Sequence, residues 1–149
     1  MKKLQKGFTL IELLVVIGIL AILTAIVLVA VNPGRQFAQA RDTQRRADVT
    51  TISAAIVAFM ADPVNRGNLP AGITTLCSTG QHNIGSGTGN LDLGAIVAPD
   101  FVAALPIDPT GGTVGDTGYQ VCVASTTARR ITVSAPNTEL TTPIISVTR

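Results

Sequence analysis

An uninterrupted apolar run near the amino terminus constrains this chain more than any other feature. Residues 13–31 read LLVVIGILAILTAIVLVAV, in which only Gly18 and Thr24 are not Ala or a large aliphatic residue. The 22 residues between Glu12 and Arg35 carry no charge. As a helix, these 19 residues would cross a hydrocarbon core of about 30 Å. The run therefore predicts a membrane-spanning helix and excludes an ordinary soluble protein.

A cleaved secretory signal peptide is the alternative explanation of this run. The apolar core of such a peptide spans about 7–15 residues and precedes a small-x-small cleavage site. This run is longer, and the sequence LVAVNPG at its end offers a poor cleavage site. The comparison favours a retained span. Lys2, Lys3 and Lys6 precede the run, and basic residues favour the cytoplasmic side of a membrane. We therefore expect a cytoplasmic amino terminus, with residues 35–149 on the other side.

Charge in the rest of the chain is sparse and balanced. Residues 35–149 carry 8 basic and 8 acidic side chains, about 14% of the segment against roughly 25% in a typical soluble domain. Without the three leading lysines, the whole chain has 8 basic and 9 acidic side chains. This balance disfavours strong nucleic-acid binding, so we expect no specific nucleic-acid partner.

A second pattern lies immediately before and across the start of the run. Lys6-Gly7-Phe8-Thr9-Leu10-Ile11-Glu12 places a Phe, a hydroxyl residue and, fifth after the Gly, one carboxylate ahead of 14 apolar or small residues. This order resembles the amino-terminal motif of the type IV pilin superfamily, which comprises pilins, minor pilins and the pseudopilins of type II secretion and competence systems. The resemblance is close over residues 1–31 and elsewhere extends only to the layout.

The resemblance implies a processing site. Residues 1–7 would be a leader that prepilin peptidase cuts after Gly7, and Phe8 would become the N-methylated terminus. Gly lacks Cβ, so the extended backbone that a protease grips can be approached closely there. A flexible joint before the helix is the alternative explanation of Gly7.

The resemblance also implies a role in assembly for Glu12, with Thr9 beside it. In filaments of this family, the corresponding carboxylate is thought to meet the terminal amine of a neighbouring subunit. The alternative is a local role in the first turn, where the helix dipole favours an anion by about 0.3–1 kcal/mol.

A second helical segment follows the span. Residues 35–48, with Arg45 and Arg46, are mostly polar, and we expect a solvated or subunit-facing neck there. From residue 49 apolar side chains recur at helical spacing up to Ala61, at Val49, Ile52, Ile56 and Phe59.

Asn32-Pro33-Gly34 separates the two helical segments. An interior Pro removes one intrahelical hydrogen bond and clashes with the carbonyl four residues earlier. Alternatively, Asn32 would cap a new helix whose first residue is Pro33. The sequence therefore predicts a kink or a break at Pro33 and Gly34, and leaves the choice open.

Alternating apolar and polar residues predict three strands near the carboxyl terminus, at 119–124, 129–135 and 145–148. Residues 125–128 are short enough for a hairpin connection. The predicted fold class is α+β, in which the later half of a long amino-terminal helix packs on a small antiparallel sheet. The predicted domains are residues 1–7 as leader, 8–31 as the transmembrane and filament-core helix, 32–62 as the amphipathic neck and 63–149 as the extracytoplasmic head.

Two cysteines fall within the predicted head. Cys77 and Cys122 are 45 positions apart, without the spacing of a zinc site or a redox dithiol. An exported head with an even number of cysteines favours a disulfide. Two buried free thiols are the alternative.

Asp108 and Asp116 flank a Gly- and Thr-rich turn, near the place where some secretion pseudopilins hold calcium. Carboxylates are suitable calcium ligands, which makes the pair a weak calcium candidate, but turn formation is the favoured explanation. The GSGTGN segment lacks the Lys-Ser/Thr of a phosphate loop. No cofactor and no metal site are expected.

The sequence thus predicts a structural subunit that reaches a cell-surface filament from the membrane. Its expected partners are copies of itself, prepilin peptidase, an inner-membrane assembly platform and the membrane. A pseudopilin of a secretion or DNA-uptake system is the alternative, and a singly anchored binding protein or enzyme is a third interpretation. One His and no recognisable nucleophile-base pattern argue against an enzyme.

Overall fold

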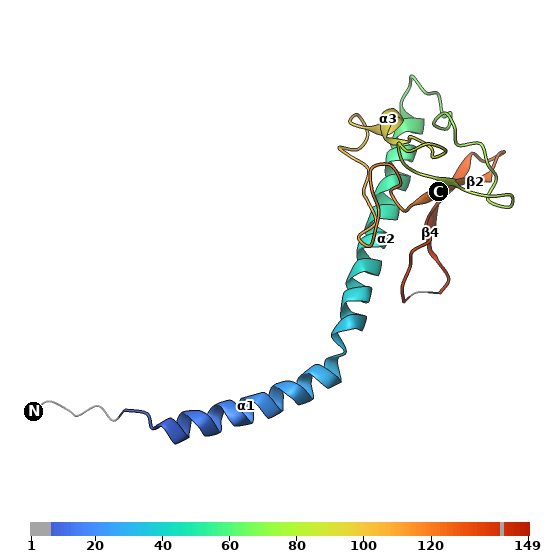
Figure 1. The fold of residues 1–149 in the computed structure, drawn as a ribbon. Coiled ribbons are helices and arrows are strands. Elements are labelled where there is room, and N and C mark those ends of the chain that lie inside the picture. The colour runs from blue at the N-terminus through green and yellow to red at the C-terminus, as the bar shows by residue number, and fades with distance from the viewer. Residues whose placement is uncertain (1–6, 141) are drawn as a thin grey trace, which may run out of the picture. The chain divides into compact units, whose positions relative to one another are not determined.

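A computed structural model describes residues 7–140 and 142–149 of the chain. Contacts divide the protein into two compact units, one ending at Phe37 and the other comprising Ala38–Arg149. Figure 1 shows the elements of both units. The second unit is called the head below.

The first helix, α1, spans Leu10–Val31 and coincides with the apolar run. None of its residues is buried, and its large apolar side chains are between 49% and 86% exposed. The hydroxyl group of Thr24 donates to the Leu20 carbonyl at 2.7 Å, so its one polar side chain beyond Glu12 is satisfied within the helix. By length and composition, α1 is able to cross a membrane.

Asn32 ends α1 and precedes the second helix, α2, at Pro33–Ala61. Its backbone is left-handed, with φ 44°, a conformation that Asn tolerates better than most residues. The Asn32 side chain then accepts the Arg35 N–H at 3.3 Å, while Pro33 occupies a first position where no N–H is needed. Between the kink and the break that the sequence left open, the structure has a break.

The head contains a four-stranded antiparallel sheet in the order β1-β2-β3-β4. The strands are β1 at His82–Asn83, β2 at Gln120–Ser125, β3 at Arg130–Ala135 and β4 at Ile145–Thr148. The three predicted strands and the α+β class are confirmed. Two short elements were not predicted, β1 and the helix α3 at Gly94–Val97. Each is too short to leave a periodic pattern in the sequence.

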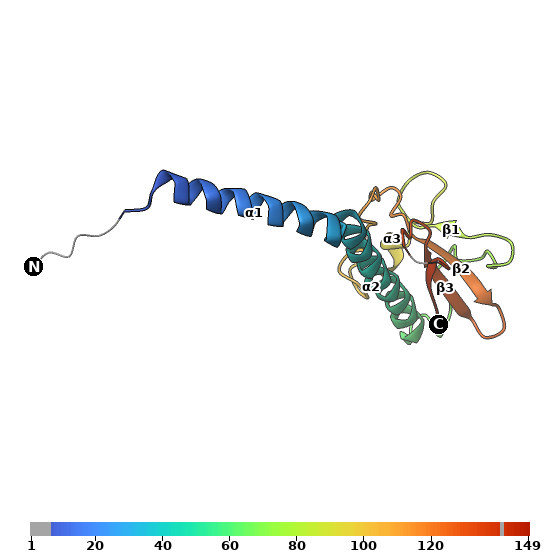
Figure 2. The ribbon, with the colours of Figure 1, turned by 90° about the horizontal axis from the view of Figure 1, so that it is seen from below.

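The core of the head lies between α2 and the sheet. Side chains of α2 at helical spacing are completely buried, and they meet side chains at every second position of β2 and β3. Figures 1 and 2 show α2 beside these strands. The cluster includes Val49, Ile52 and Ile56 from α2 and Val121, Val123, Ile131 and Val133 from the strands.

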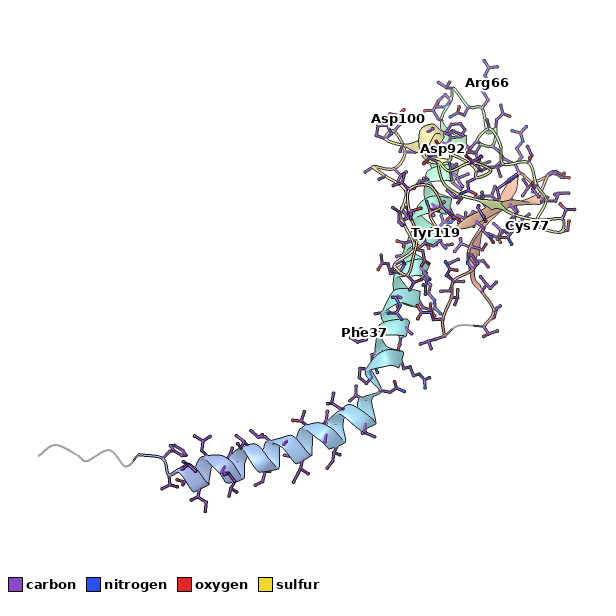
Figure 3. The ribbon with its side chains drawn as sticks, viewed as in Figure 1. Phe37, Arg66, Cys77, Asp92, Asp100 and Tyr119 are labelled. Atoms are coloured by element: carbon purple, nitrogen blue, oxygen red, sulfur yellow. A yellow bond between two sulfur atoms is a disulfide. The ribbon has the colours of Figure 1, made fainter. Side chains whose placement is uncertain are left out.

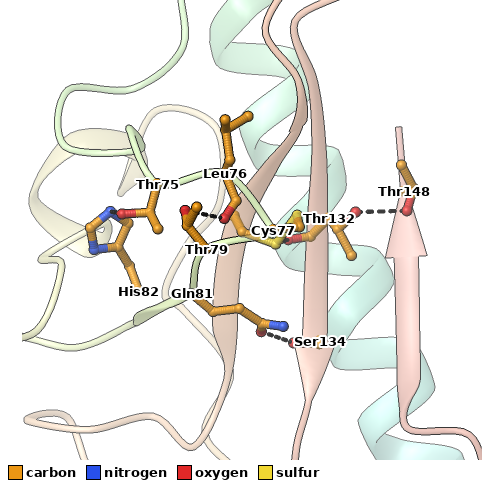
Figure 4. The surroundings of a disulfide bond; sticks show 10 residues. Thr75, Leu76, Cys77, Thr79, Gln81, His82, Thr132, Ser134 and Thr148 are labelled. Carbon is orange, nitrogen blue, oxygen red and sulfur yellow. Dashed lines mark hydrogen bonds between the residues drawn. A yellow bond between two sulfur atoms is a disulfide. The ribbon is translucent and has the colours of Figure 1, made fainter.

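A disulfide joins Cys77 to Cys122, which confirms the predicted pair, with Cα atoms 5.0 Å apart. Cys77 also donates its N–H to the Val123 carbonyl at 3.0 Å. Figure 4 shows the bridge linking the loop after α2 to β2, beside β3. The bond therefore ties the loop-rich middle of the head to its sheet.

Candidate processing and assembly site

Gly7 and Phe8 precede the first turn of α1, and both are exposed, Phe8 by 82%. A Cβ atom added at Gly7 would meet no heavy atom within 4 Å. The fold itself therefore does not require Gly at this position. An enzyme would find the Gly7–Phe8 peptide bond accessible.

Thr9 and Glu12 form a reciprocal cap on the first turn of α1. The hydroxyl oxygen of Thr9 accepts the Glu12 N–H at 3.3 Å, and Oε2 of Glu12 accepts the Thr9 N–H at 3.3 Å. The Thr9 hydroxyl group also donates to Oε2 at 3.2 Å. This capping box satisfies two backbone donors that the helix cannot pair by itself.

The cap uses only one of the two carboxylate oxygens of Glu12, so the other can accept a further hydrogen bond. In the described residues its other oxygen, Oε1, accepts no hydrogen bond, and the next charge along the chain is Arg35. A shallow recess of about 300 Å³ lies beside it, lined by Gly7, Phe8, Thr9 and Glu12. Chemically, the site is an exposed anion at the positive end of a helix, open to a cation.

Residues 2–28 match the family model described as the prokaryotic N-terminal methylation motif. The chain carries a prepilin-type signal. It thereby has the features of a type IV pilin-like or pseudopilin precursor, a structural class of protein. No curated protein and no solved structure matched the chain. The matched residues include Lys2, Lys3 and Lys6 of the predicted leader, which lie outside the described residues.

Beyond the prepilin-type signal, the head contains an ionic cluster around Arg45. This side chain is completely buried and donates to three carboxylates and one hydroxyl group. The nitrogen–oxygen distances are 2.7 Å to Asp108, 2.9 Å to Asp42 and 2.9 Å to Glu139. Thr110 accepts a further bond at 2.7 Å. The cluster joins α2 to the loop after residue 105 and to the loop between β3 and β4.

The electrostatics of the cluster favour its charged form. Burial alone would raise the pKa of Asp42, but the N–H groups of Glu139 and Leu140 and the Arg45 guanidinium outweigh it and lower that pKa to about 2. Hydrogen bonds from Arg41 and Arg45 lower the pKa of Glu139 to about 2. The pKa of Asp108 is lowered as well, because bonds from Arg45 and Thr110 outweigh burial.

One expectation from the sequence is wrong here. Arg45 was expected in a solvated or subunit-facing neck, but it lies in the interior of the head, because three carboxylates compensate its charge. Of the weak calcium candidate, Asp108 is 3% exposed and both of its carboxylate oxygens accept bonds from Arg45. Asp116 is exposed and bonds the Gly118 N–H instead, at 3.0 Å.

A second polar contact crosses the same interface. The hydroxyl group of Tyr119, a buried residue of the segment before β2 (labelled in Figure 3), donates to Asp48 of α2 at 2.6 Å. Burial and this carboxylate raise the pKa of Tyr119. The Asp42–Arg45 spacing on one helix was the only local signal for these contacts, since their other partners lie at least 63 residues away.

Proposed function

We propose that this chain is a type IV pilin-like structural subunit. Prepilin peptidase cuts it after Gly7, Phe8 becomes the methylated terminus, and the processed copies assemble into a helical filament at the cell surface. The match of residues 2–28 to the methylation motif carries the proposal. The membrane holds the subunit before assembly, and an inner-membrane platform adds it to the filament.

The surface of α1 supports the proposal. A helix that is apolar all round must be buried in a membrane or against other helices, yet none of the 22 residues of α1 is buried within its own chain. The membrane would cover this surface before assembly, and the helices of neighbouring copies would cover it afterwards. The same surface therefore serves two successive environments.

Glu12 supplies the polar contact that such a bundle needs. A carboxylate within an apolar environment requires a partner, and Thr9 already satisfies only one of its two oxygens. Cleavage after Gly7 creates an amine at Phe8. Pairing between Glu12 and the amine of a neighbouring copy would neutralise both charges and fix the axial register, because a shifted helix would leave each charge unpaired.

The lysine distribution provides a direct test of processing. All lysines of the chain, Lys2, Lys3 and Lys6, lie in the proposed leader, and residues 8–149 contain none. Amine-reactive labelling of the denatured mature chain should therefore detect the terminal amine alone, and intact mass should place the terminus at Phe8. A Gly7→Val variant should keep the leader and its lysines. A mature chain that still begins at Met1 would contradict the proposal.

Filament purification tests the second half of the proposal. Surface filaments should contain this processed chain as a main subunit. Pseudopilins carry the same kind of signal, so a processed chain found only in short structures that stay within the cell envelope would favour a secretion or DNA-uptake role. A processed chain that never assembles would leave a singly anchored protein.

A further inference from the structure

The charges of the head are segregated along the chain. Residues 67–128 contain four aspartates and no lysine or arginine, and the segment is bounded by Arg66 and Arg129. One of these aspartates, Asp108, is neutralised by Arg45 in the interior. The other three are exposed, and in the described residues none of them forms an ion pair.

The three exposed aspartates, Asp92, Asp100 and Asp116, form an acidic patch around α3. Asp92 and Asp100 lie on either side of this helix, which spans four residues. The side chain of Asn90, two residues before Asp92, donates to the carbonyl of Gly115 at 2.7 Å. Because Gly115 precedes Asp116, this bond places Asp116 near Asp92. A hollow of about 290 Å³ is lined by Asp92 and by Val114 and Thr117, so the two segments border one surface.

Four exposed arginines, Arg66, Arg129, Arg130 and Arg149, form a basic patch where the β2–β3 turn meets the end of β4. Arg129 donates to the carbonyl of Gly67 at 2.7 Å, which brings the turn against Arg66. Arg149 and Ile131 exchange backbone hydrogen bonds of 2.8 and 2.9 Å, which brings Arg149 beside Arg130. Asp62, four residues before Arg66, is the nearest acidic side chain along the chain.

The two patches occupy different sides of the head. In Figure 1, α3 and the β2–β3 turn lie on opposite sides of the end of α2, and in Figure 2 they again lie apart. In Figure 3, Asp92 and Asp100 lie toward α3, and Arg66 lies at an end of the head. Every copy therefore presents one acidic and one basic surface at separate places.

We propose that the acidic patch of one head contacts the basic patch of the next head in the filament. The proposal rests on the proposed function, because it requires assembly. Subunits related by a screw operation meet through two different surfaces, so the contact is heterologous and needs complementary patches. Electrostatic complementarity between them favours the correct neighbour and orientation. Each exposed pair is weak, but the contact recurs at every subunit.

A second copy explains both patches better than an anionic polymer does. A polymer would use the arginines alone, and the acidic patch of the same head would repel it. A nucleic acid would also gain from aromatic stacking, but the only Tyr is buried and the four Phe lie at positions 8, 37, 59 and 101, outside the basic patch. The acidic patch supplies three carboxylates to the four guanidinium groups of the basic patch.

The test uses filaments from cells that produce the full chain with substitutions in either patch. The basic variant is Arg66→Glu with Arg130→Glu, because neither side chain makes a hydrogen bond or ion pair within the described residues. The acidic variant is Asp92→Asn with Asp100→Arg. The Asp92→Asn change keeps a side-chain oxygen to accept the Ala95 N–H, so α3 retains its start. Arg129 is left unchanged because it holds the turn in place.

Each variant should reduce the amount of sheared filament by at least about threefold, and salt at about 0.5 M should reduce the parent's yield in the same way. The two variants change net charge in opposite directions, so a general charge effect would make one weaken and the other strengthen assembly. Combining all four substitutions exchanges the sign of the charge at Asp100 with that at Arg66 and Arg130, which allows new opposite pairs across the contact, and should restore filaments toward the parent level.

Three further results decide the matter. Parent-like filaments from both single-patch variants would overturn the proposal, and so would a combined variant no better than either. Loss of heparin or DNA binding by the basic variant, with normal filaments, would instead assign the arginines to a polyanion and overturn the contact. Mass spectrometry of the Phe8 terminus is measured in parallel. If the parent itself is unprocessed or forms no filament, the proposed function fails. If the parent is processed and forms filaments, and the patch variants form them equally well, only the proposed contact fails.

Discussion

The two long helices of this chain, α1 and α2, differ in which kinds of side chain they bury. In α1 none of 22 residues is buried, although the helix is almost entirely apolar. In α2 eight residues are buried, and they include Asp42 and Arg45. Exposure of apolar side chains in one helix and burial of charge in the other both reverse the usual pattern. The head's own loops cover the charges of α2, and the proposed function would cover α1 with the membrane or with other copies of the chain.

Charge is also satisfied over different distances in the two regions. Glu12 bonds to Thr9, three residues away, whereas Arg45 bonds to residues 63 and 94 positions along the chain. The local cap can form as soon as the first turn does. The Arg45 cluster can form only after the head has folded. Substitutions in the two regions should therefore affect assembly and folding separately.

The largest effect is expected from Glu12→Ala. The variant should insert into the membrane and lose its leader, but filament yield should fall by about tenfold or more, since an incoming amine would find no carboxylate. Filament yield by shearing, with intact mass as the processing control, measures this. Thr9→Val is the matched control for the cap, because it removes the hydroxyl group and leaves the carboxylate. Normal filaments from Glu12→Ala would restrict Glu12 to the local capping role.

The second effect concerns the head alone. Arg45→Met should lower the free energy of unfolding by about 3–5 kcal/mol, because it leaves buried carboxylates without a cation. Arg41→Met is the control, since Arg41 pairs with Glu139 at the surface, where such pairs contribute about 0–1 kcal/mol. Denaturant unfolding of the detergent-solubilised chain compares the two. Equal losses would show that the depth of the Arg45 cluster has no energetic importance.

Removal of the disulfide should have an effect of similar or smaller size. Cys77→Ala with Cys122→Ala opens a loop of 45 residues and should destabilise the head by about 2–4 kcal/mol. Membrane insertion of α1 should not change, because the bridge lies entirely within the head. Unfolding under oxidising and reducing conditions measures the loss. A parent whose stability is unaffected by reductant would contradict this prediction.

The sequence predicted those features that depend on local patterns. The apolar run predicted α1, the spacing of Val49, Ile52 and Ile56 predicted the buried face of α2, and alternation predicted β2, β3 and β4. The motif around Gly7 and Glu12 predicted the prepilin-type signal. Each of these needs information from fewer than about 30 neighbouring residues.

The sequence failed where distant residues determine the environment. Arg45 is followed by another Arg in a polar segment, which is typical of a solvated surface. Its burial becomes favourable when Asp108 and Glu139, from distant parts of the chain, join Asp42 around it. The two charged patches were missed for a related reason. The balanced net charge does not show that acidic and basic side chains gather at different places on the head. No local pattern shows that Arg149 lies beside the β2–β3 turn.

The smallest expected effect is a pH dependence that separates the two regions once more. The pKa values of Asp42 and Glu139 are lowered to about 2 in the folded head, from ordinary values of 3.8 and 4.5. A lowered folded pKa means that the unfolded chain binds protons first as the pH falls. The stabilisation is therefore fully present above about pH 5 and is lost progressively toward about pH 2.

The thermal midpoint of the head should consequently stay constant between about pH 7 and 5 and fall by about 5 °C or more between about pH 5 and 3. Arg45→Met supplies the decisive comparison. Without the guanidinium, Asp42 and Asp108 would remain buried beside each other's charge, which raises a carboxyl pKa instead of lowering it. Acid should then relieve repulsion, so the midpoint of this variant should fall less than that of the parent or should rise. Differential scanning fluorimetry of both proteins across this pH range measures the difference. Parallel profiles would mean that the acid sensitivity arises outside the Arg45 cluster, and that the cluster does not hold its carboxylates ionised.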